Sequence, residues 1–222
     1  MGRAKEIIVK VIPASIANEF VKKHHYSGKV VPNSQLHFGA FLDGDLHGVM
    51  SFGPSINKEG TINLVSGTGW NEFIELNRMA FDDYLPKNSE SRCIAISMRL
   101  IKKYAPQIKW VISFADGCQC GDGTIYRASG FLLVGITQNT AIRINPETGE
   151  KVHIIQAHHK KIASKEFRSW GAVNGNMLKY IYFLDASKKQ DLTVPVLPFS
   201  KIDEVGAGMY KGEAVTLAER HK

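Results

Sequence analysis

The stretch ELNRMAFDDYLPKNSESR (Glu75–Arg92) holds the corner of the chain that decides the fold. It continues an alternating apolar run, Phe73–Phe81, through a polar loop into a segment with helical spacing. A nearly continuous apolar run, Ile108–Ala115, follows and is typical of a strand buried on both faces. The order strand, loop, helix, strand predicts a parallel crossover and therefore a layered α/β domain.

The helix after the loop has recognisable ends. Asn88 or Ser89 can cap its first turn, and Pro106 stops it. Its predicted buried stripe is Ile94, Met98, Ile101 and Tyr104. A helix N-terminus attracts phosphate because its first N–H groups are unpaired and its dipole is positive there. Capping alone would explain the same residues equally well.

The segments on either side of this corner extend the α/β pattern. Upstream, the sequence predicts a strand at 6–12, a helix that begins after Pro13 and a hairpin that turns at Asp43-Gly44. Downstream, it predicts a short helix that ends at Gly130, a strand at 131–137, a hairpin around 146–149 and a strand at 177–185. The expected architecture is a mixed central sheet flanked by helices, residues 1–185, with an insertion at about 138–175 between the last two core strands and an extension at 186–222.

Composition sets broad limits on the class of protein. The chain has 222 residues, 44% hydrophobic and 22% charged, which is ordinary for a globular protein. No apolar run reaches the roughly 20 residues of a membrane span, and the start shows no secretion signal. Three cysteines indicate a reducing cytoplasm, that of the host cell if the chain is phage-encoded. A net charge of +7 favours a polyanionic partner, although many basic proteins bind none.

Four blocks of sequence together resemble a known family. They are HHYSGK, ELNRMAFDDYLPKNSESR, KWVISFADG and GTIYRASGFLLVG, and the resemblance is close over 21–137 and loose elsewhere. The blocks resemble the phage Mom family of DNA-modification proteins, within the GNAT acyltransferase superfamily. This resemblance implies a GNAT-like fold and a transferase that acts on adenine N6 in double-stranded DNA. The expected product is N6-methylcarbamoyl (acetamido) adenine, which protects phage DNA from host restriction.

The resemblance also implies a set of catalytic residues, which are His25, Tyr26, Arg78, Asp116 and Tyr126. Each has a chemical interpretation beside an ordinary one. His25 could act as a general base, or be a loop histidine without a role. Asp116, at the end of a buried strand, could orient a base or accept a proton from adenine, or simply form a turn. Tyr126 could protonate a departing CoA thiolate, or pack.

Arg78 lies in a strand that otherwise resembles a buried one. A buried guanidinium needs a partner, and we expect Asp116, Glu75 or a bound phosphate. A core ion pair is the structural alternative.

An acyl-CoA such as acetyl-CoA is the cofactor that the resemblance implies. The residues predicted to bind it are Lys87, Asn88, Ser89, Ser91 and Arg92. The stretch LPKNSESR departs from the superfamily's phosphate-binding turn because it contains no glycine. A metal is conceivable but is not predicted. His24, His25 and Asp116 offer ligands, and Cys118 and Cys120 form a Cys-x-Cys motif. Zinc sites usually combine two such motifs, and the sequence contains no second one.

DNA binding is predicted in two places. The loop HHYSGK offers Tyr26 for stacking on a flipped base and Lys29 for phosphate. The segment HHKKIASKEFRSW combines Phe167 and Trp170 with the predicted phosphate-binding residues Lys160, Lys161, Lys165 and Arg168. A solvated basic face would explain the same charges.

Two other functions stay open on the sequence. A conventional acyl-CoA-dependent N-acetyltransferase, acting on a protein or a small amine, shares the core but needs neither the basic segment nor the HHYSGK loop. A non-enzymatic DNA-binding protein on the same scaffold would explain the missing glycines.

Overall fold

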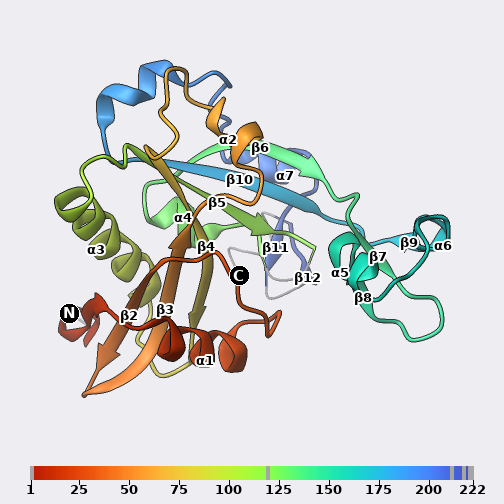
Figure 1. Cartoon of the computed structure of the whole chain (residues 1–222), viewed down its shortest axis with the longest axis horizontal. Helices are drawn as coiled ribbons and strands as arrows, with labels where there is room; N and C mark the ends of the chain where they lie inside the picture. Colours follow the sequence, from red (N-terminus) through yellow and green to blue (C-terminus); the bar gives the residue numbers. More distant parts are fainter. Residues whose placement is uncertain (1–2, 119–120, 211–212, 217–218, 220–222) are drawn as a thin grey trace. The chain divides into compact units, whose positions relative to one another are not determined.

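The computed structural model of the chain describes residues 3–118, 121–210, 213–216 and 219 (Figure 1). The chain divides into two compact units. Unit 1 comprises 1–113, 124–134 and 180–197, and unit 2 comprises 114–123, 135–179 and 198–222.

The helices and strands are grouped by unit, and within each group they follow the order of the chain. Those of unit 1 are η1 (Arg3–Glu6), β1 (Ile8–Val11), α1 (Ala14–His24), β2 (Leu36–Leu42), β3 (Asp45–Gly53), α2 (Lys58–Ile62), β4 (Phe73–Phe81), α3 (Ser89–Tyr104), α4 (Thr124–Ala128) and η2 (Ala186–Asp191). Three strands begin in one unit and end in the other: β5 (Trp110–Asp116), β6 (Leu132–Gln138) and β10 (Asn176–Phe183). Those of unit 2 are β7 (Ile142–Ile144), β8 (Lys151–His153), α5 (Ile154–His159), α6 (Ser164–Ser169), β9 (Gly171–Ala172), α7 (Ser200–Glu204), β11 (Met209–Tyr210) and β12 (Glu213–Ala214).

A seven-stranded mixed sheet in the order β1-β2-β3-β4-β5-β10-β6 organises the fold. The first four strands are antiparallel neighbours, and β4 pairs parallel with β5 through the α3 crossover. The turn between β2 and β3 falls at Asp43 and Gly44, whose φ angles of 54° and 94° suit a tight hairpin turn. The predicted α/β class, with helices flanking a mixed central sheet, is confirmed.

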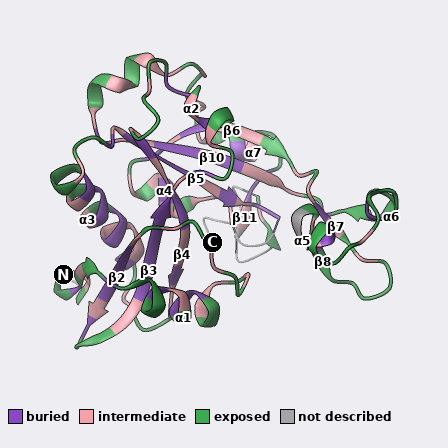
Figure 2. Cartoon of the chain, viewed as in Figure 1, coloured by how far each residue is buried: buried purple, intermediate pink, exposed green. Residues whose placement is uncertain are grey.

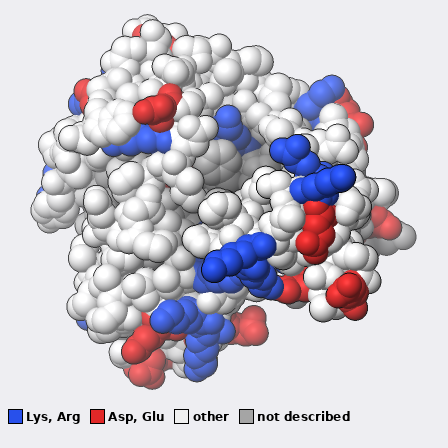
Figure 3. Space-filling model, turned by 45° about the vertical axis from the view of Figure 1, so that its right-hand side comes forward, with Lys and Arg blue, Asp and Glu red and all other residues white. Residues whose placement is uncertain are grey.

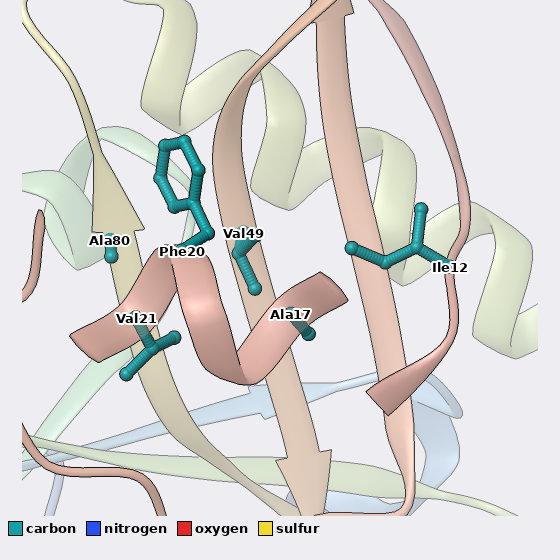
Figure 4. Packing of buried hydrophobic residues seen from close by; sticks show 6 residues of the cluster. All are labelled: Ile12, Ala17, Phe20, Val21, Val49 and Ala80. Atoms are coloured by element: carbon teal, nitrogen blue, oxygen red, sulfur yellow. The ribbon is translucent and has the colours of Figure 1, made fainter. Parts of the chain in front are cut away.

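Helices α1 and α3 cover opposite faces of this sheet. On one face, Phe20 of α1 packs in a cluster with Val49 of β3 and Ala80 of β4 (Figure 4). On the other, the Ser97 hydroxyl of α3 donates to Met50 Sδ at 3.5 Å. Val49 and Met50 are consecutive on β3, so their side chains point to opposite faces. Figure 2 shows buried residues concentrated along the strands that these helices cover.

Helix α3 confirms most of its predicted stripe and corrects two details. Ile94, Met98 and Ile101 are buried as predicted, but Tyr104 is 71% exposed because it ends the helix beyond the last turn that packs. Asn88 occupies the cap position with φ 69°, and its side chain makes no capping hydrogen bond. The buried Ser89 hydroxyl donates to the Pro86 carbonyl instead. The predicted side-chain cap is therefore wrong.

The insertion between β6 and β10 lies in unit 2 and builds its own small core. Strands β7, β8 and β9 form a three-stranded sheet, which confirms the predicted hairpin around 146–149. Helices α5 and α6 pack beside it, and the buried residues of this core are Val152, Ala157, Phe167 and Trp170. Phe167 and Trp170 are 3% and 7% exposed. They were predicted beside DNA-contacting lysines, but they stabilise the insertion instead.

Candidate functional site

A bulge in β4 marks the place where β4 and β5 stop pairing. The parallel register covers only Phe73–Glu75 of β4 against β5. Two residues later, Ser51 of β3 faces Arg78 while its neighbour Phe52 faces Leu76, so Asn77 is the extra residue. A bulge bends the strand and re-aims the side chains that follow. The strands β4 and β5 therefore separate just before Arg78.

Arg78 is held by two carbonyl oxygens. Its Nε donates to Lys29 O at 3.0 Å, and its Nη1 donates to Asn77 O at 2.9 Å. Among the described residues, no carboxylate lies within ion-pair distance of Arg78. The acidic partner that was expected is therefore replaced by neutral acceptors. The charge of the guanidinium is therefore not cancelled by an ion pair, although it opposes the burial that raises the pKa of the nearby Glu75.

His25 lies in the turn that follows α1, four residues before Lys29, whose carbonyl binds Arg78. The Gly28 amide donates to His25 O at 2.8 Å, and Gly28 has φ 59°. The Ser27 amide donates to His25 Nδ1 at 3.1 Å, and Ser27 Oγ lies 2.8 Å from the same nitrogen. Burial, and then the charge of Arg78, lower the pKa of His25 to about 4. The imidazole is therefore neutral at physiological pH.

Tyr26 provides an exposed aromatic surface beside His25. The two ring centroids are 4.2 Å apart, and Tyr26 is 52% exposed. The Lys29 carbonyl that binds Arg78 belongs to the same loop. The structure thus brings together four of the predicted residues, which are His25, Tyr26, Lys29 and Arg78.

Tyr126, on α4, is buried and connected to β4 through a serine that the sequence interpretation missed. Ser113 Oγ lies 2.9 Å from Tyr126 Oη and 3.1 Å from the Leu76 carbonyl. The serine has one proton, so Tyr126 donates to it whenever Ser113 donates to Leu76 O. The pairing of β4 with β5 ends just before this carbonyl. A polar residue inside the apolar run of β5 was the only sequence signal for Ser113.

Glu75 is a second residue whose role was underestimated. It is half-buried on β4, and burial raises its pKa, although hydrogen bonds to Ser55 and Asn77 oppose that shift. A carboxyl group with a raised pKa near an arginine is a feature of functional sites as well as of structural networks. An acidic residue in an alternating apolar strand was the signal available in the sequence.

Asp116 belongs to unit 2. Its Oδ1 accepts the Cys118 amide at 2.9 Å, as a turn-forming aspartate does. Cys118 is buried, and Cys120 lies outside the described residues. Within the described part of the chain, no three histidine, cysteine or acidic side chains gather closely enough to hold a metal ion.

The predicted cofactor residues at the start of α3 differ in their accessibility. Lys87 and Asn88 are exposed, whereas the Ser89 hydroxyl is buried and bonded to Pro86. The Ser91 hydroxyl donates to Asn88 O at 3.2 Å. Arg92 reaches Lys5 O through Nη2 at 3.4 Å, and its Nε is buried without a partner among the described residues. Charge for a phosphate is therefore present, but one of the two serine hydroxyls is turned inward.

The basic residues of the insertion also differ from one another. Lys160 is paired with Glu150 at 2.7 Å, whereas Lys161, Lys165 and Arg168 are exposed. Figure 3 shows basic side chains on the surface with acidic ones beside several of them. In the insertion, the Lys160–Glu150 pair offsets part of the positive charge.

Comparison with known proteins gives a consistent result. The sequence profile described as the Mom protein family matches residues 6–201. The protein named Methylcarbamoylase mom of Escherichia phage Mu is 31% identical over 214 residues, which cover 89% of this chain and 85% of that protein. No helix in the described part of the chain has the length and apolar character needed to cross a membrane.

Solved structures with a similar arrangement include acetyltransferases. Spermidine/spermine N-acetyltransferase SpeG from Vibrio cholerae is 6% identical with a TM-score of 0.49, over 85% of this chain and 99% of that chain. An IAA acetyltransferase from Bacillus cereus ATCC 14579 is 12% identical with a TM-score of 0.46, over 80% of this chain and 99% of that chain.

Proposed function

The chain belongs to the Mom protein family, and on that premise we propose that it is a transferase that modifies adenine in double-stranded DNA. The proposed product is N6-methylcarbamoyl (acetamido) adenine, and its proposed biological role is to protect phage DNA from host restriction. The observation that carries the proposal is the 31% identity, over most of both chains, to a phage protein named as a methylcarbamoylase.

The cluster at the β4 bulge supports this proposal chemically. An amine of a paired base is stacked inside the duplex, so the base has to be flipped out before it can react. The exposed Tyr26 ring offers a stacking surface, and Arg78 offers a positive charge that makes no ion pair with a described carboxylate. Stacking and charge are what a flipped nucleotide requires from its binding site.

The remaining predicted residues complete the proposed chemistry. Adenine N6 has to lose a proton when it forms the new bond, and we assign Asp116 as the acceptor. Tyr126 is assigned as the proton donor to the leaving group. Its hydroxyl lies 2.9 Å from Ser113 Oγ, and this hydrogen bond helps to orient it.

The proposed cofactor is acyl-CoA, and the start of α3 suits its pyrophosphate. Lys87 is exposed there, and Arg92 Nε is buried without a partner in the described part of the chain. When bound, acyl-CoA would supply an activated acyl group. Simple acyl transfer would leave an amide on N6, bonded through the carbonyl carbon. A methylcarbamoyl group is bonded through its methylene carbon and ends in an amide nitrogen that acetyl-CoA does not contain, so this product requires a further rearrangement or a different donor. The two products differ in mass.

Nucleoside mass spectrometry of plasmid DNA from cells that express the chain tests the proposal. We expect a methylcarbamoyl deoxyadenosine species and resistance of the plasmid to restriction digestion. The Arg78→Lys variant should lose most of the product, because the compact ammonium of lysine lacks the planar fork of donors that reaches two carbonyls in fixed directions and still faces a ligand. Arg99→Lys, at an exposed position on α3, is the matched control.

The other outcomes identify the alternatives. An acetyl adduct would mean ordinary acyl transfer to the base. Unmodified DNA from cells that contain folded protein would overturn the proposal. Acyl-CoA binding would then indicate a conventional N-acetyltransferase, and DNA binding without it a non-enzymatic DNA-binding protein.

A further inference from the structure

The hydrogen bonds around His25 determine which of its ring nitrogens carries the proton. The Ser27 backbone N–H donates to Nδ1 at 3.1 Å. An amide nitrogen can only donate, so Nδ1 must present its lone pair. A neutral imidazole has one N–H, and that proton must therefore be on Nε2.

The Ser27 hydroxyl reinforces this arrangement. Its Oγ lies 2.8 Å from His25 Nδ1, and the Lys29 amide donates to that Oγ at 3.3 Å. Since Nδ1 is an acceptor, the hydroxyl donates to it. The chain of bonds from Lys29 through Ser27 to His25 thus has a single consistent direction.

The surroundings of His25 keep the ring neutral. Burial and the nearby Arg78 charge both oppose its protonation. The Tyr26 ring lies tilted against it, whereas the ring of the preceding His24 stacks on Phe20 at 4.3 Å between centroids. A neutral ring with an occupied Nδ1 has no basic nitrogen to offer a substrate.

We propose that Ser27 is a positioning residue that holds His25 as the Nε2–H tautomer, and that His25 donates a hydrogen bond to the reacting group instead of acting as the general base. The acceptor would be the carbonyl oxygen of an acyl group, which gains negative charge when a nucleophile attacks the carbonyl carbon. His25 Nε2–H and the Arg78 guanidinium then favour that charge together. The identity of the reacting group rests on the proposed function, but the tautomer does not.

Nitrogen-15 NMR of the labelled protein, without DNA or cofactor, tests the tautomer directly. We expect His25 to show a protonated Nε2 and an unprotonated Nδ1 at pH 7, and the signals that disappear in the His25→Gln variant assign that residue. Ser27→Ala keeps the backbone amide and should keep the same tautomer. Protonation at Nδ1 in the wild-type chain, or in Ser27→Ala, would overturn the proposal.

Activity of matched variants tests the donor role. Glutamine places an N–H where Nε2 stood and has no basic nitrogen, so His25→Gln should stay within about tenfold of wild type, whereas His25→Ala should lose about 10²–10³-fold. Equal losses in the two variants would show that basicity matters and would sink the donor role. His24→Gln is the control, with wild-type activity expected. If the wild-type chain leaves DNA unmodified, the proposed function fails while the NMR result still decides the tautomer.

Discussion

At the residue scale, the cluster at the bulge depends on neutral partners for charged or titratable side chains. Arg78 is held by the carbonyls of Lys29 and Asn77, and His25 by the amide and hydroxyl of Ser27. Carbonyls fix the direction of a guanidinium without cancelling its charge. A rigid positive group beside a neutral imidazole is suited to a substrate that develops negative charge.

The lowered pKa of His25 predicts how pH affects stability. The unfolded chain takes up a proton on this histidine near its ordinary pKa of 6.5, whereas the folded chain resists protonation until about 4. The contribution of His25 to stability is therefore complete above pH 6.5 and is lost as pH falls toward 4. We expect His25→Gln to show a smaller fall in melting temperature across this window than wild type. Thermal unfolding at several pH values measures it, with His24→Gln as control, and parallel curves for wild type and His25→Gln would contradict the prediction.

The hydroxyl of Tyr126 should contribute to stability and, separately, to activity. Tyr126→Phe removes one buried hydrogen bond to Ser113, so the free energy of unfolding should fall by about 1 kcal/mol in denaturant titration. Ser113→Ala should cost a similar amount because it leaves both the phenol and the Leu76 carbonyl without that bond. If Tyr126 donates a proton in the reaction, only Tyr126→Phe abolishes the DNA product. Full activity of Tyr126→Phe would exclude that role.

At the scale of elements, α3 and β4 have different tasks. Helix α3 stabilises the fold through a continuous stripe of buried side chains. In β4, regular pairing is interrupted at Asn77, beside Arg78. The bulge is tolerated because the Asn77 side chain is itself bonded: its Oδ1 accepts the Ser34 hydroxyl at 3.1 Å. A buried amide without such a partner would be costly.

The stripe of α3 predicts contrasting effects of two substitutions. Met98→Ala should lower the free energy of unfolding by about 2–5 kcal/mol, because Met98 is buried against the sheet and its loss leaves a cavity. Tyr104→Ala should change it by less than about 0.5 kcal/mol, since the ring is exposed at the helix end. Chemical denaturation of both variants measures the difference. Similar losses for the two would contradict the burial pattern.

At the scale of the whole molecule, the predicted chemistry is divided between two compact units. His25, Tyr26, Arg78 and Tyr126 belong to unit 1, while Asp116 and the basic insertion belong to unit 2. The insertion has its own core around Phe167 and Trp170, so its surface lysines can be changed with little effect on packing. That independence makes the proposed DNA contacts testable by charge reversal.

The insertion predicts unequal contributions from its lysines to DNA binding. Lys161→Glu together with Lys165→Glu should weaken binding to duplex DNA and reduce the slope of log affinity against log salt by about two. Lys160→Glu should have a smaller effect, because Glu150 already neutralises that lysine. Measuring the affinity for duplex DNA at several salt concentrations compares the double variant with Lys160→Glu. Unchanged affinity and slope in the double variant would remove the insertion from the proposed interface.

Much of the fold was predictable from local pattern. Strand alternation, helical spacing and the Asp43-Gly44 turn are set by backbone geometry, which acts over a few residues. They predicted the order of the elements, the mixed sheet and the insertion between its last core strands. The four sequence blocks likewise identified the family.

The partners inside the site were decided by the tertiary structure alone. Arg78 meets the Lys29 carbonyl across 49 positions of the chain, and Ser113 meets the Leu76 carbonyl across 37. No local pattern carries that information, because such a contact depends on how distant segments pack and where a bulge interrupts a strand. For the same reason the burial of Ser89, Phe167 and Trp170 differed from expectation. The sequence by itself determined which residue types were available, and packing determined which of their atoms were left to meet a ligand.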